Sequence, residues 1–315
     1  MPRSSSKPAS APAAFAPSIA LVVDRVDWHA RELMRAFSAL GARAAPLMLP
    51  DCAIDTGGGG LSIAGFGARL PDAVLVRSMA GGPFEAVTLR LGILHALGDV
   101  GVLVWNSARA IERCVDKSAT SFLLAHAGIP TPATWATESI DRAREIVREE
   151  TKSAPLVLKP LFGSQGRGLR LIRRAEELPA PADVAGVFYL QRYVAVERDG
   201  FRDFRLLVSQ GKVIATMMRH AATWITNVKQ GGRPLTAVAD AEMKDLAIGA
   251  TAAVGADFAG VDILYGADGR PTVLEVNSMP AWSGLQKVTA VNIAATLAND
   301  LVAAIGRAKR HEAAV

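Results

Sequence analysis

Short apolar runs alternate with stretches of helical periodicity in the first third of the chain. The run SIALVVD, residues 18–24, is typical of a buried strand. Between residues 28 and 43, four apolar residues share one helical face: Leu33, Met34, Phe37 and Leu40. Gly41 is predicted to end this helix. This strand-helix unit is repeated by the strand-like DAVLVRS, the helix-like FEAVTLRLGILHALGDVG and the strand-like VLVWNS. Residues 18–107 therefore predict a Rossmann-like domain with a small parallel sheet flanked by helices.

The rest of the chain predicts two lobes of mixed structure. Residues 107–135 indicate one amphipathic helix that ends at Gly128, and residues 155–174 indicate two strands joined by a glycine loop. We expect a central α+β lobe over residues 108–187. The strand pairs DFRLLVSQGKVIATMM and GVDILYGADGRPTVLEVN, with helices at 240–254 and after 288, predict a C-terminal lobe over residues 188–315.

Two segments carry no predicted helix or strand. Residues 1–17 are rich in Ser, Pro and Ala, and prolines interrupt every apolar stretch, so we interpret them as a disordered tail. The run DTGGGG, residues 55–60, lacks G-x-G-x-x-G spacing. It favours a flexible loop over a cofactor-binding turn.

The composition narrows the function classes. With 315 residues, half of them hydrophobic, the chain can bury a large core in two or three lobes. No segment has about 18 uninterrupted apolar residues, so we expect no membrane span. The net charge of +5 is dispersed, so we expect no nucleic-acid partner, and an anionic small substrate such as ATP explains the charge equally well. Cys52 and Cys114 are too few for a disulfide framework and favour a cytoplasmic protein.

The stretch KPLFGSQGRGLRLI, residues 159–172, is a candidate phosphate grip. It is not a Walker A motif, because Gly-Lys-Ser/Thr is missing and Lys159 precedes the glycines. A strand-loop-strand flap of this kind could lay backbone N–H groups over phosphates while Lys159 supplies a charge. Taken alone, the pattern leaves a glycine-bearing hairpin turn equally open.

Three oxygen-bearing residues interrupt the apolar strands of GVDILYGADGRPTVLEVN. Glu275 and Asn277 are two residues apart and therefore point to the same face of a strand, and Asp262 could join them across the predicted hairpin. Hard oxygen donors suit Mg²⁺ that bridges nucleotide phosphates. The alternative is a solvated hairpin face with incidental acids.

Other polar residues are weaker candidates. Arg77 ends the predicted strand DAVLVRS, from which it could hold a substrate carboxylate in a cleft, although a solvated strand-end arginine is at least as common. His29, His95 and His220 show no metal-ligand spacing and are interpreted as surface or core histidines.

Together these segments resemble the ATP-grasp superfamily, and within it the RimK-like carboxylate–amine ligases. The resemblance covers roughly residues 75–305. It rests on seven segments in the family's order: CVDKSATSFLLAHAGIPTP, LVLKPLFGSQGRGLRLI, LQRYV, DFRLLV, TNVKQGG, GVDIL and LEVNSMP. It implies an ATP-grasp fold, combining α/β and α+β parts, behind an N-terminal pre-ATP-grasp domain with a parallel sheet.

The resemblance implies a role for each matching residue. Lys117 and Lys159 match lysines that reach the nucleotide phosphates. The phosphate-covering loop is matched by Gly163, Ser164, Gln165 and Gly166. The hinge against which adenine lies is matched by Gln191, Arg192, Tyr193 and Val194. Asp203 matches a carboxylate near the ribose, and Asn227 matches an asparagine on the nucleotide and metal side.

The remaining matches concern catalysis. Asp262, Glu275 and Asn277 match ligands of Mg²⁺, for which Mn²⁺ is an alternative. Arg205 and Arg219 match arginines near the transferred phosphate, where they would offset charge as a carboxylate attacks the γ-phosphorus. Catalysis would then consist mainly of positioning and electrostatics. An isolated arginine of this kind is more often a surface ion-pair partner.

The chain departs from the family pattern at places that bear on the substrate. The hinge has Arg192 where RimK-like enzymes commonly have Glu, but hinge contacts to adenine are largely made by the backbone. Trp224 and Ile225 stand where protein-modifying relatives are more basic. Trp224 could pack on a ring of the substrate or belong to the core. The segment NSMPAWSGLQ is more similar to the branch that adds glutamate to pterin or deazaflavin cofactors than to the ribosomal-protein branch.

We therefore expect an ATP- and Mg²⁺-dependent ligase that joins a small-molecule carboxylate to an amino acid, glutamate first, through an acyl phosphate, with a role in cofactor biosynthesis. ATP should lie between the central and C-terminal lobes. The alternatives are a non-catalytic ATP-binding regulator on the same fold and a glutamate ligase that modifies a protein C-terminus. The sequence leaves homo-oligomer formation open.

Overall fold

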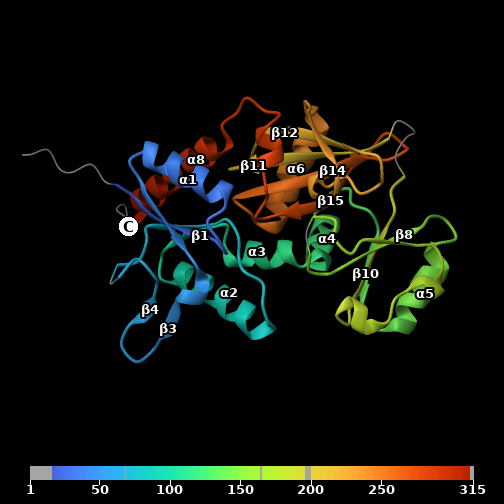
Figure 1. The fold of residues 1–315 in the computed structure, drawn as a ribbon, viewed down its shortest axis with the longest axis horizontal. Helices are drawn as coiled ribbons and strands as arrows, with labels where there is room; N and C mark the ends of the chain where they lie inside the picture. Colours follow the sequence, from blue (N-terminus) through green and yellow to red (C-terminus); the bar gives the residue numbers. More distant parts are fainter. Residues whose placement is uncertain (1–15, 68, 164, 196–199, 313–315) are drawn as a thin grey trace, which may run out of the picture.

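The computed structural model describes residues 16–67, 69–163, 165–195 and 200–312. The predicted tail lies outside the described residues except for residues 16 and 17, and so does Ser164. Three main sheets follow one another along the chain, and Figure 1 shows the third of them between the first and the second. None of the described helices is long and apolar enough to cross a membrane.

The first sheet is parallel, with the strand order β2-β1-β5-β6. Its strands are β1 (Ser18–Val22), β2 (Arg43–Leu47), β5 (Ala73–Val76) and β6 (Leu103–Trp105), connected by helices α1 (Trp28–Ala39) and α2 (Phe84–Asp99). The predicted parallel sheet is confirmed. Helix α1 ends one residue before Leu40, which is 39% exposed, so Leu40 does not share the buried face of Leu33 and Phe37.

Strand β2 was not predicted, because RAAPL lacks a continuous apolar run and β2 lies at the edge of the sheet. The glycine run 55–60 lies in a small hairpin. Strands β3 (Ala53–Asp55) and β4 (Gly60–Ser62) pair antiparallel, and the residues between them form the connecting turn. The run was expected to be a flexible loop, but its first and last residues, Asp55 and Gly60, belong to the paired strands of this hairpin.

The amphipathic stretch after residue 107 forms two helices rather than the predicted single one. Helix α3 (Ala108–Val115) and helix α4 (Lys117–His126) are separated by Asp116. The Asp116 carboxylate accepts hydrogen bonds from the backbone N–H groups of Ser118 and Ala119 at 2.8 and 3.2 Å, which makes it the N-cap of α4. The break places Lys117 in the first turn of α4.

The second sheet has the order β7-β10-β8-β9. It consists of β7 (Thr134–Thr137), β8 (Leu156–Lys159), β9 (Arg170–Ile172) and β10 (Phe188–Arg192), with helix α5 (Ile140–Glu150) packed against it. Strand β10 pairs with β7 and β8, although its residues were assigned to the C-terminal lobe. We therefore propose that the boundary between the two lobes lies after residue 192.

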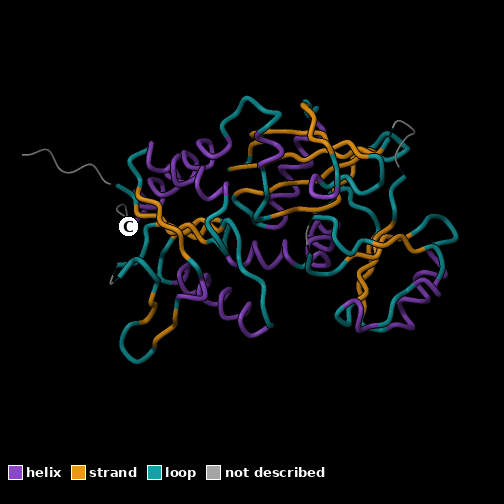
Figure 2. Tube along the Cα trace, in the orientation of Figure 1, coloured by secondary structure: helices purple, strands orange, loops and turns teal. Residues whose placement is uncertain are grey.

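The third sheet is antiparallel, in the order β13-β12-β11-β14-β15. Its strands are the group of long orange segments in the upper part of Figure 2. Its strands are β11 (Phe201–Ser209), β12 (Lys212–Ala221), β13 (Arg233–Thr236), β14 (Phe258–Tyr265) and β15 (Pro271–Asn277). Helix α6 (Ala241–Val254) packs on this sheet. After the short helix α7 (Ser283–Gln286), helix α8 (Ile293–Glu312) returns to α1, so one apolar core joins the first and third sheets.

Replacing Asp116 by Ala tests the helix break. If α4 needs its cap, Asp116→Ala should lower the free energy of unfolding by about 1 kcal/mol, whereas Asp116→Asn, which also caps, should change it little. A continuous helix through residue 116 would instead be stabilised by Ala, the better helix former. Urea denaturation of the three proteins distinguishes the two signs.

Candidate active site

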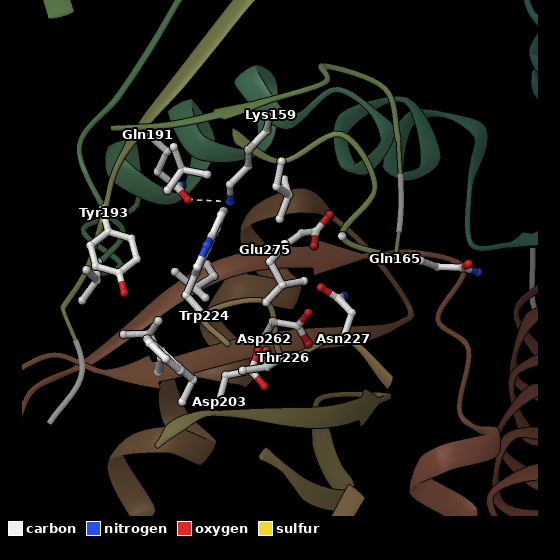
Figure 3. A pocket seen from close by; sticks show the side chains of 18 of the residues that line it. Lys159, Gln165, Gln191, Tyr193, Asp203, Trp224, Thr226, Asn227, Asp262 and Glu275 are labelled. Carbon is white, nitrogen blue, oxygen red and sulfur yellow. Dashed lines mark hydrogen bonds between the residues drawn. The ribbon is translucent and has the colours of Figure 1, made fainter. Parts of the chain in front are cut away.

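One pocket lies between the second and third sheets and gathers most of the predicted site residues (Figure 3). Fifteen of the predicted residues line it: Lys117, Lys159, Gly163, Gln165, Gly166, Gln191, Arg192, Tyr193, Val194, Asp203, Arg219, Trp224, Asn227, Asp262 and Glu275. Arg77, Arg205 and Asn277 are not among the residues that line it, and Ser164 is not described. The sequence missed most of the aliphatic residues of the lining, which include Val157, Leu264 and Leu274.

Two lysines lie at the second-sheet side of the pocket. Lys159 Nζ donates to Gln191 Oε1 at 2.6 Å, and Lys117 Nζ donates to the backbone oxygens of Leu161 and Gly163 at 3.2 and 2.9 Å. Burial lowers the pKa of both lysines, and the charge of Glu275 opposes this shift. An anion such as phosphate would further favour the charged forms.

The glycine loop contacts the segment after β12 across the pocket. Gly166 has φ +71°, and a Cβ there would lie 2.5 Å from Asn227 Oδ1 and 2.8 Å from Ile225 Cγ2. Only glycine fits this approach and this backbone conformation without strain. The adjacent Gln165 side chain points away from the other labelled residues in Figure 3.

The predicted adenine hinge lies at the end of β10, where the chain leaves the second sheet. Tyr193 meets Trp224 edge to face, with ring centroids 6.1 Å apart, so Trp224 lies beside the predicted adenine hinge. The Arg192 guanidinium pairs with Glu150 and lies over the Trp135 ring at 5.8 Å. The Gln-Arg-Tyr departure is thus accommodated by interactions with protein groups.

A row of alternating charges crosses the third sheet beneath the pocket. Arg205 Nε and Nη2 each donate to Asp262 at 2.7 Å, and Arg219 Nε donates to Asp203 at 2.8 Å. Arg219 also reaches Asp262 at 3.0 Å and thereby joins the two pairs. Strand register explains the arrangement, because Asp203 lies opposite Arg219 on β12, and Arg205 lies opposite Asp262 on β14.

These buried ion pairs shift the pKa values of Asp262 and Arg219. Burial alone would raise the pKa of Asp262, but the charges of Arg205 and Arg219 outweigh it and lower the pKa to about 2. Burial would lower the pKa of Arg219, but Asp262 and Asp203 raise it overall. Both oxygens of Asp203 accept hydrogen bonds from Arg219, so this carboxylate holds a guanidinium at the site where a ribose contact was expected.

The three predicted metal-binding residues come from the β14–β15 hairpin. Asp262 lies opposite Glu275, and Asn277 lies opposite Gly260. Glu275 has no hydrogen-bond or ion-pair partner among the described residues, although it lies in the field of Lys117 and Lys159. Carboxylate and amide oxygens fit Mg²⁺, which prefers oxygen ligands, and the two nearby lysines leave room in the charge balance for phosphates.

Arg77 and His29 lie inside the protein rather than in the pocket. Arg77 is 7% exposed, and its guanidinium contacts Asp27 at 3.4 Å, His29 at 3.1 Å and the ring of Trp282 at 5.5 Å. His29 is also buried, which agrees with its interpretation as a core histidine. These contacts of Arg77 are to protein groups and it does not line the pocket, so its expected role in holding a substrate carboxylate stays a prediction.

Comparison with known proteins agrees with this arrangement. Residues 114–301 match the RimK-like ATP-grasp domain. The tetrahydromethanopterin:α-L-glutamate ligase of Methanosarcina acetivorans is 33% identical over 254 residues, which cover 70% of this chain and 76% of that enzyme. The ligase of the same name from Methanococcus maripaludis is 36% identical over 205 residues, covering 63% and 69% of the two chains.

A solved structure has the same fold over nearly the whole chain. The ATP-grasp ligase PsnB, complexed with a minimal precursor, Mg and ADP, superimposes with a TM-score of 0.68 at 23% identity and covers 91% of this chain and 98% of its own. The fold and the pocket thus define an ATP-grasp protein. The chain belongs to the RimK-like ATP-grasp family, and it is a carboxylate–amine ligase.

The buried charge row can be tested at Asp203. Asp203→Asn leaves Arg219 with one carboxylate partner instead of two, so we expect the free energy of unfolding to fall by about 3 kcal/mol. The exposed neighbour Arg202 is a suitable control, since Arg202→Ala should change stability by less than about 0.5 kcal/mol. Equal urea midpoints for the two variants would contradict the structural role of Asp203.

Proposed function

We propose that the protein uses ATP and Mg²⁺ to join a small-molecule carboxylate to the amino group of L-glutamate through an acyl phosphate. The observation that carries this proposal is the convergence on one pocket of two lysines, a glycine flap and the acids Asp262 and Glu275. A protein that only bound nucleotide would have less need of metal-binding oxygens beside the phosphate lysines.

Each part of ATP would have its own place in the pocket. Tyr193 and Trp224 would flank the adenine, and Lys117 and Lys159 would meet the phosphates. The glycine flap would cover them, since Gly166 already contacts the opposite side of the pocket at Asn227. A closed flap excludes water, which protects an acyl phosphate from hydrolysis.

The metal site would be built from Asp262, Glu275 and Asn277. Glu275 projects into the pocket, whereas Asp262 is held in place by Arg205 and Arg219. Mg²⁺ bound there would neutralise charge on the β- and γ-phosphates of ATP. Asn277 lies two residues beyond Glu275, on the same face of β15, and would complete the oxygen ligands.

The reaction would proceed in two displacements. The acceptor carboxylate attacks the γ-phosphorus and releases ADP, and the glutamate amine then attacks the acyl carbon and releases phosphate, leaving an amide. Arg219 and Arg205 lie next to Asp262 and would offset the negative charge that builds up around the phosphoryl group. We propose no covalent attachment to the protein.

A pterin-type acid is the proposed acceptor class. Two relatives that are more than 30% identical to this chain are named tetrahydromethanopterin:α-L-glutamate ligases. The direct test incubates the protein with ATP, Mg²⁺, glutamate and candidate pterin acids and follows ADP release and product mass. ADP release that needs both substrates, with a gain of one glutamate residue on a pterin acid, supports the proposal.

Other outcomes of this test would favour the alternatives. Nucleotide binding without ADP release under every substrate pair would indicate a regulator. A mass gain on a protein C-terminus instead of the small acid would place this chain among the protein-modifying ligases.

Glu275→Gln tests the metal assignment. The variant keeps the shape of the side chain but removes a charge, so we expect near-normal folding, a raised Mg²⁺ requirement and a roughly 100-fold loss of turnover. Glu242, exposed in the first turn of α6, provides the control Glu242→Gln, which should leave turnover and the Mg²⁺ titration unchanged. If both variants titrate alike, the hairpin is not the metal site.

Lys159→Ala tests the phosphate grip. Without nucleotide the variant should melt near the wild-type temperature, because the lysine is not part of an apolar core. It should lose most of the stabilisation that ATP with Mg²⁺ gives the wild type through binding linkage. The exposed Lys212 on β12 gives the control Lys212→Ala. A full ATP-induced shift in the Lys159 variant would show that the lysine does not bind phosphate.

A further inference from the structure

The Asn106 side chain links the first sheet to the third through four hydrogen bonds to backbone groups. It follows β6 directly and is 0% exposed. Its Nδ2 donates to the backbone oxygens of Phe258 and Ser278 at 2.7 and 2.8 Å, and its Oδ1 accepts from the N–H groups of Asp257 and Phe258 at 2.6 and 3.0 Å. The amide therefore uses two donors and two acceptors, its full capacity.

These four hydrogen bonds hold the open end of the β14–β15 hairpin, which carries the proposed metal-binding residues. Phe258 begins β14, and Ser278 immediately follows Asn277 at the end of β15. One rigid amide thus fixes where the two strands stand relative to each other at the end opposite their connecting turn. The ring of Trp105, next to Asn106 in the chain, also packs on Phe258 with centroids 5.1 Å apart.

The segment after β15 is held at almost every residue. Arg77 donates to the backbone oxygen of Met279 at 3.5 Å, and Pro280 lies so close to β14 that a Cβ on Gly260 would be 2.8 Å from it. His29 Nε2 accepts from the N–H groups of Trp282 and Ser283, both at 3.2 Å. The N-terminal domain therefore anchors the segment that follows β15.

We propose that Asn106, a residue of the N-terminal domain, is a positioning residue. It sets the distance between the metal-binding oxygen on β14 and those on β15. This inference rests on the proposed function, since it concerns the same metal site. Asn106 does not touch the pocket itself. It acts through the backbone of residues 257–258 and 278, and so through the separation of Asp262 from Glu275 and Asn277.

The coupling has a physical reason. Metal affinity depends on holding ligands in a fixed geometry, and the groups that orient ligands commonly contribute tenfold to a hundredfold to that affinity. A buried amide with four satisfied bonds is a rigid support, because breaking any one of them leaves a buried polar backbone group unpaired. Apolar packing alone would permit small shifts between the strands.

The test measures metal binding without turnover. ADP binding is followed by calorimetry over a Mg²⁺ titration and, separately, in EDTA. For Asn106→Ala we expect the Mg²⁺ concentration at half-saturation to rise about tenfold or more, with ADP affinity in EDTA nearly unchanged. Controls for lost stability are Ile93→Val and Leu97→Ala, two core changes in α2 of the same domain that do not touch the hairpin.

Asn106→Asp keeps the size and both acceptor bonds but loses the donations to Phe258 and Ser278 when ionised. Protonation would restore one donor, so the Mg²⁺ defect relative to wild type should shrink as the pH falls from about 8 to about 6, since a buried carboxyl has a raised pKa. Ionisation of the same carboxyl also lowers the stability of this variant as the pH rises, so the α2 controls are needed to show that lost stability alone leaves the Mg²⁺ affinity unchanged.

Hydrogen exchange on the wild type tests the same coupling without a variant. The N–H groups of Asp257 and Phe258 should gain protection with ADP and Mg²⁺ together, but not with ADP in EDTA. The proposal fails if protection is unchanged, or if Asn106→Ala and Asn106→Asp match the α2 controls in Mg²⁺ affinity. If the wild type itself shows no Mg²⁺-dependent ADP binding, it is the proposed function that fails.

Discussion

The buried charge row on the third sheet is the constraint on which the site depends. Burying a carboxylate or a guanidinium is costly, and the cost is offset only when each charge meets a partner in good geometry. Asp203, Arg219, Asp262 and Arg205 meet this condition because they occupy facing positions on three adjacent strands. The register of β11 with β12 and β14 therefore decides whether the pocket has a charged floor at all.

That floor gives Asp262 and Glu275, two of the acids that line the pocket, different environments. Asp262 is bonded by two arginines and remains ionised far into the acid range. Glu275, on the neighbouring strand, has lysines nearby but no direct partner among the described residues. One carboxylate is thus fixed by protein cations, while the other is open to a bound cation. This division suits a site that must bring a metal, phosphates and an anionic substrate together.

The pocket walls come from different sheets, and their mutual placement depends on contacts outside the pocket. Lys159 and the glycine flap belong to the second sheet, whereas Asp262 and Glu275 belong to the third. Helix α8 and the segment after β15 bind the third sheet to the first. The N-terminal domain, whose described residues do not line the pocket, is therefore tied to the strand that carries Glu275 and Asn277, two of the proposed metal-binding residues.

Local patterns in the sequence were enough to predict much of the fold and most of the pocket residues. Apolar periodicity indicated the parallel sheet. The order of short motifs indicated the ATP-grasp fold, and it also indicated which residues gather at the pocket, because those residues lie within the motifs themselves. The break at Asp116 was missed because helical periodicity continues across it, and the edge strand β2 lacks a clear apolar pattern.

Only the tertiary structure decided which groups pair across large distances in the chain. Arg77 stood at a strand end like a substrate residue, yet its neighbours Asp27, His29 and Trp282 enclose it. Asn106 carried no signal, since the four backbone groups that it joins lie more than 150 residues away. Backbone polar groups are the same in every residue, so a side chain that binds them leaves no matching residue type in the sequence from which its partner could be inferred.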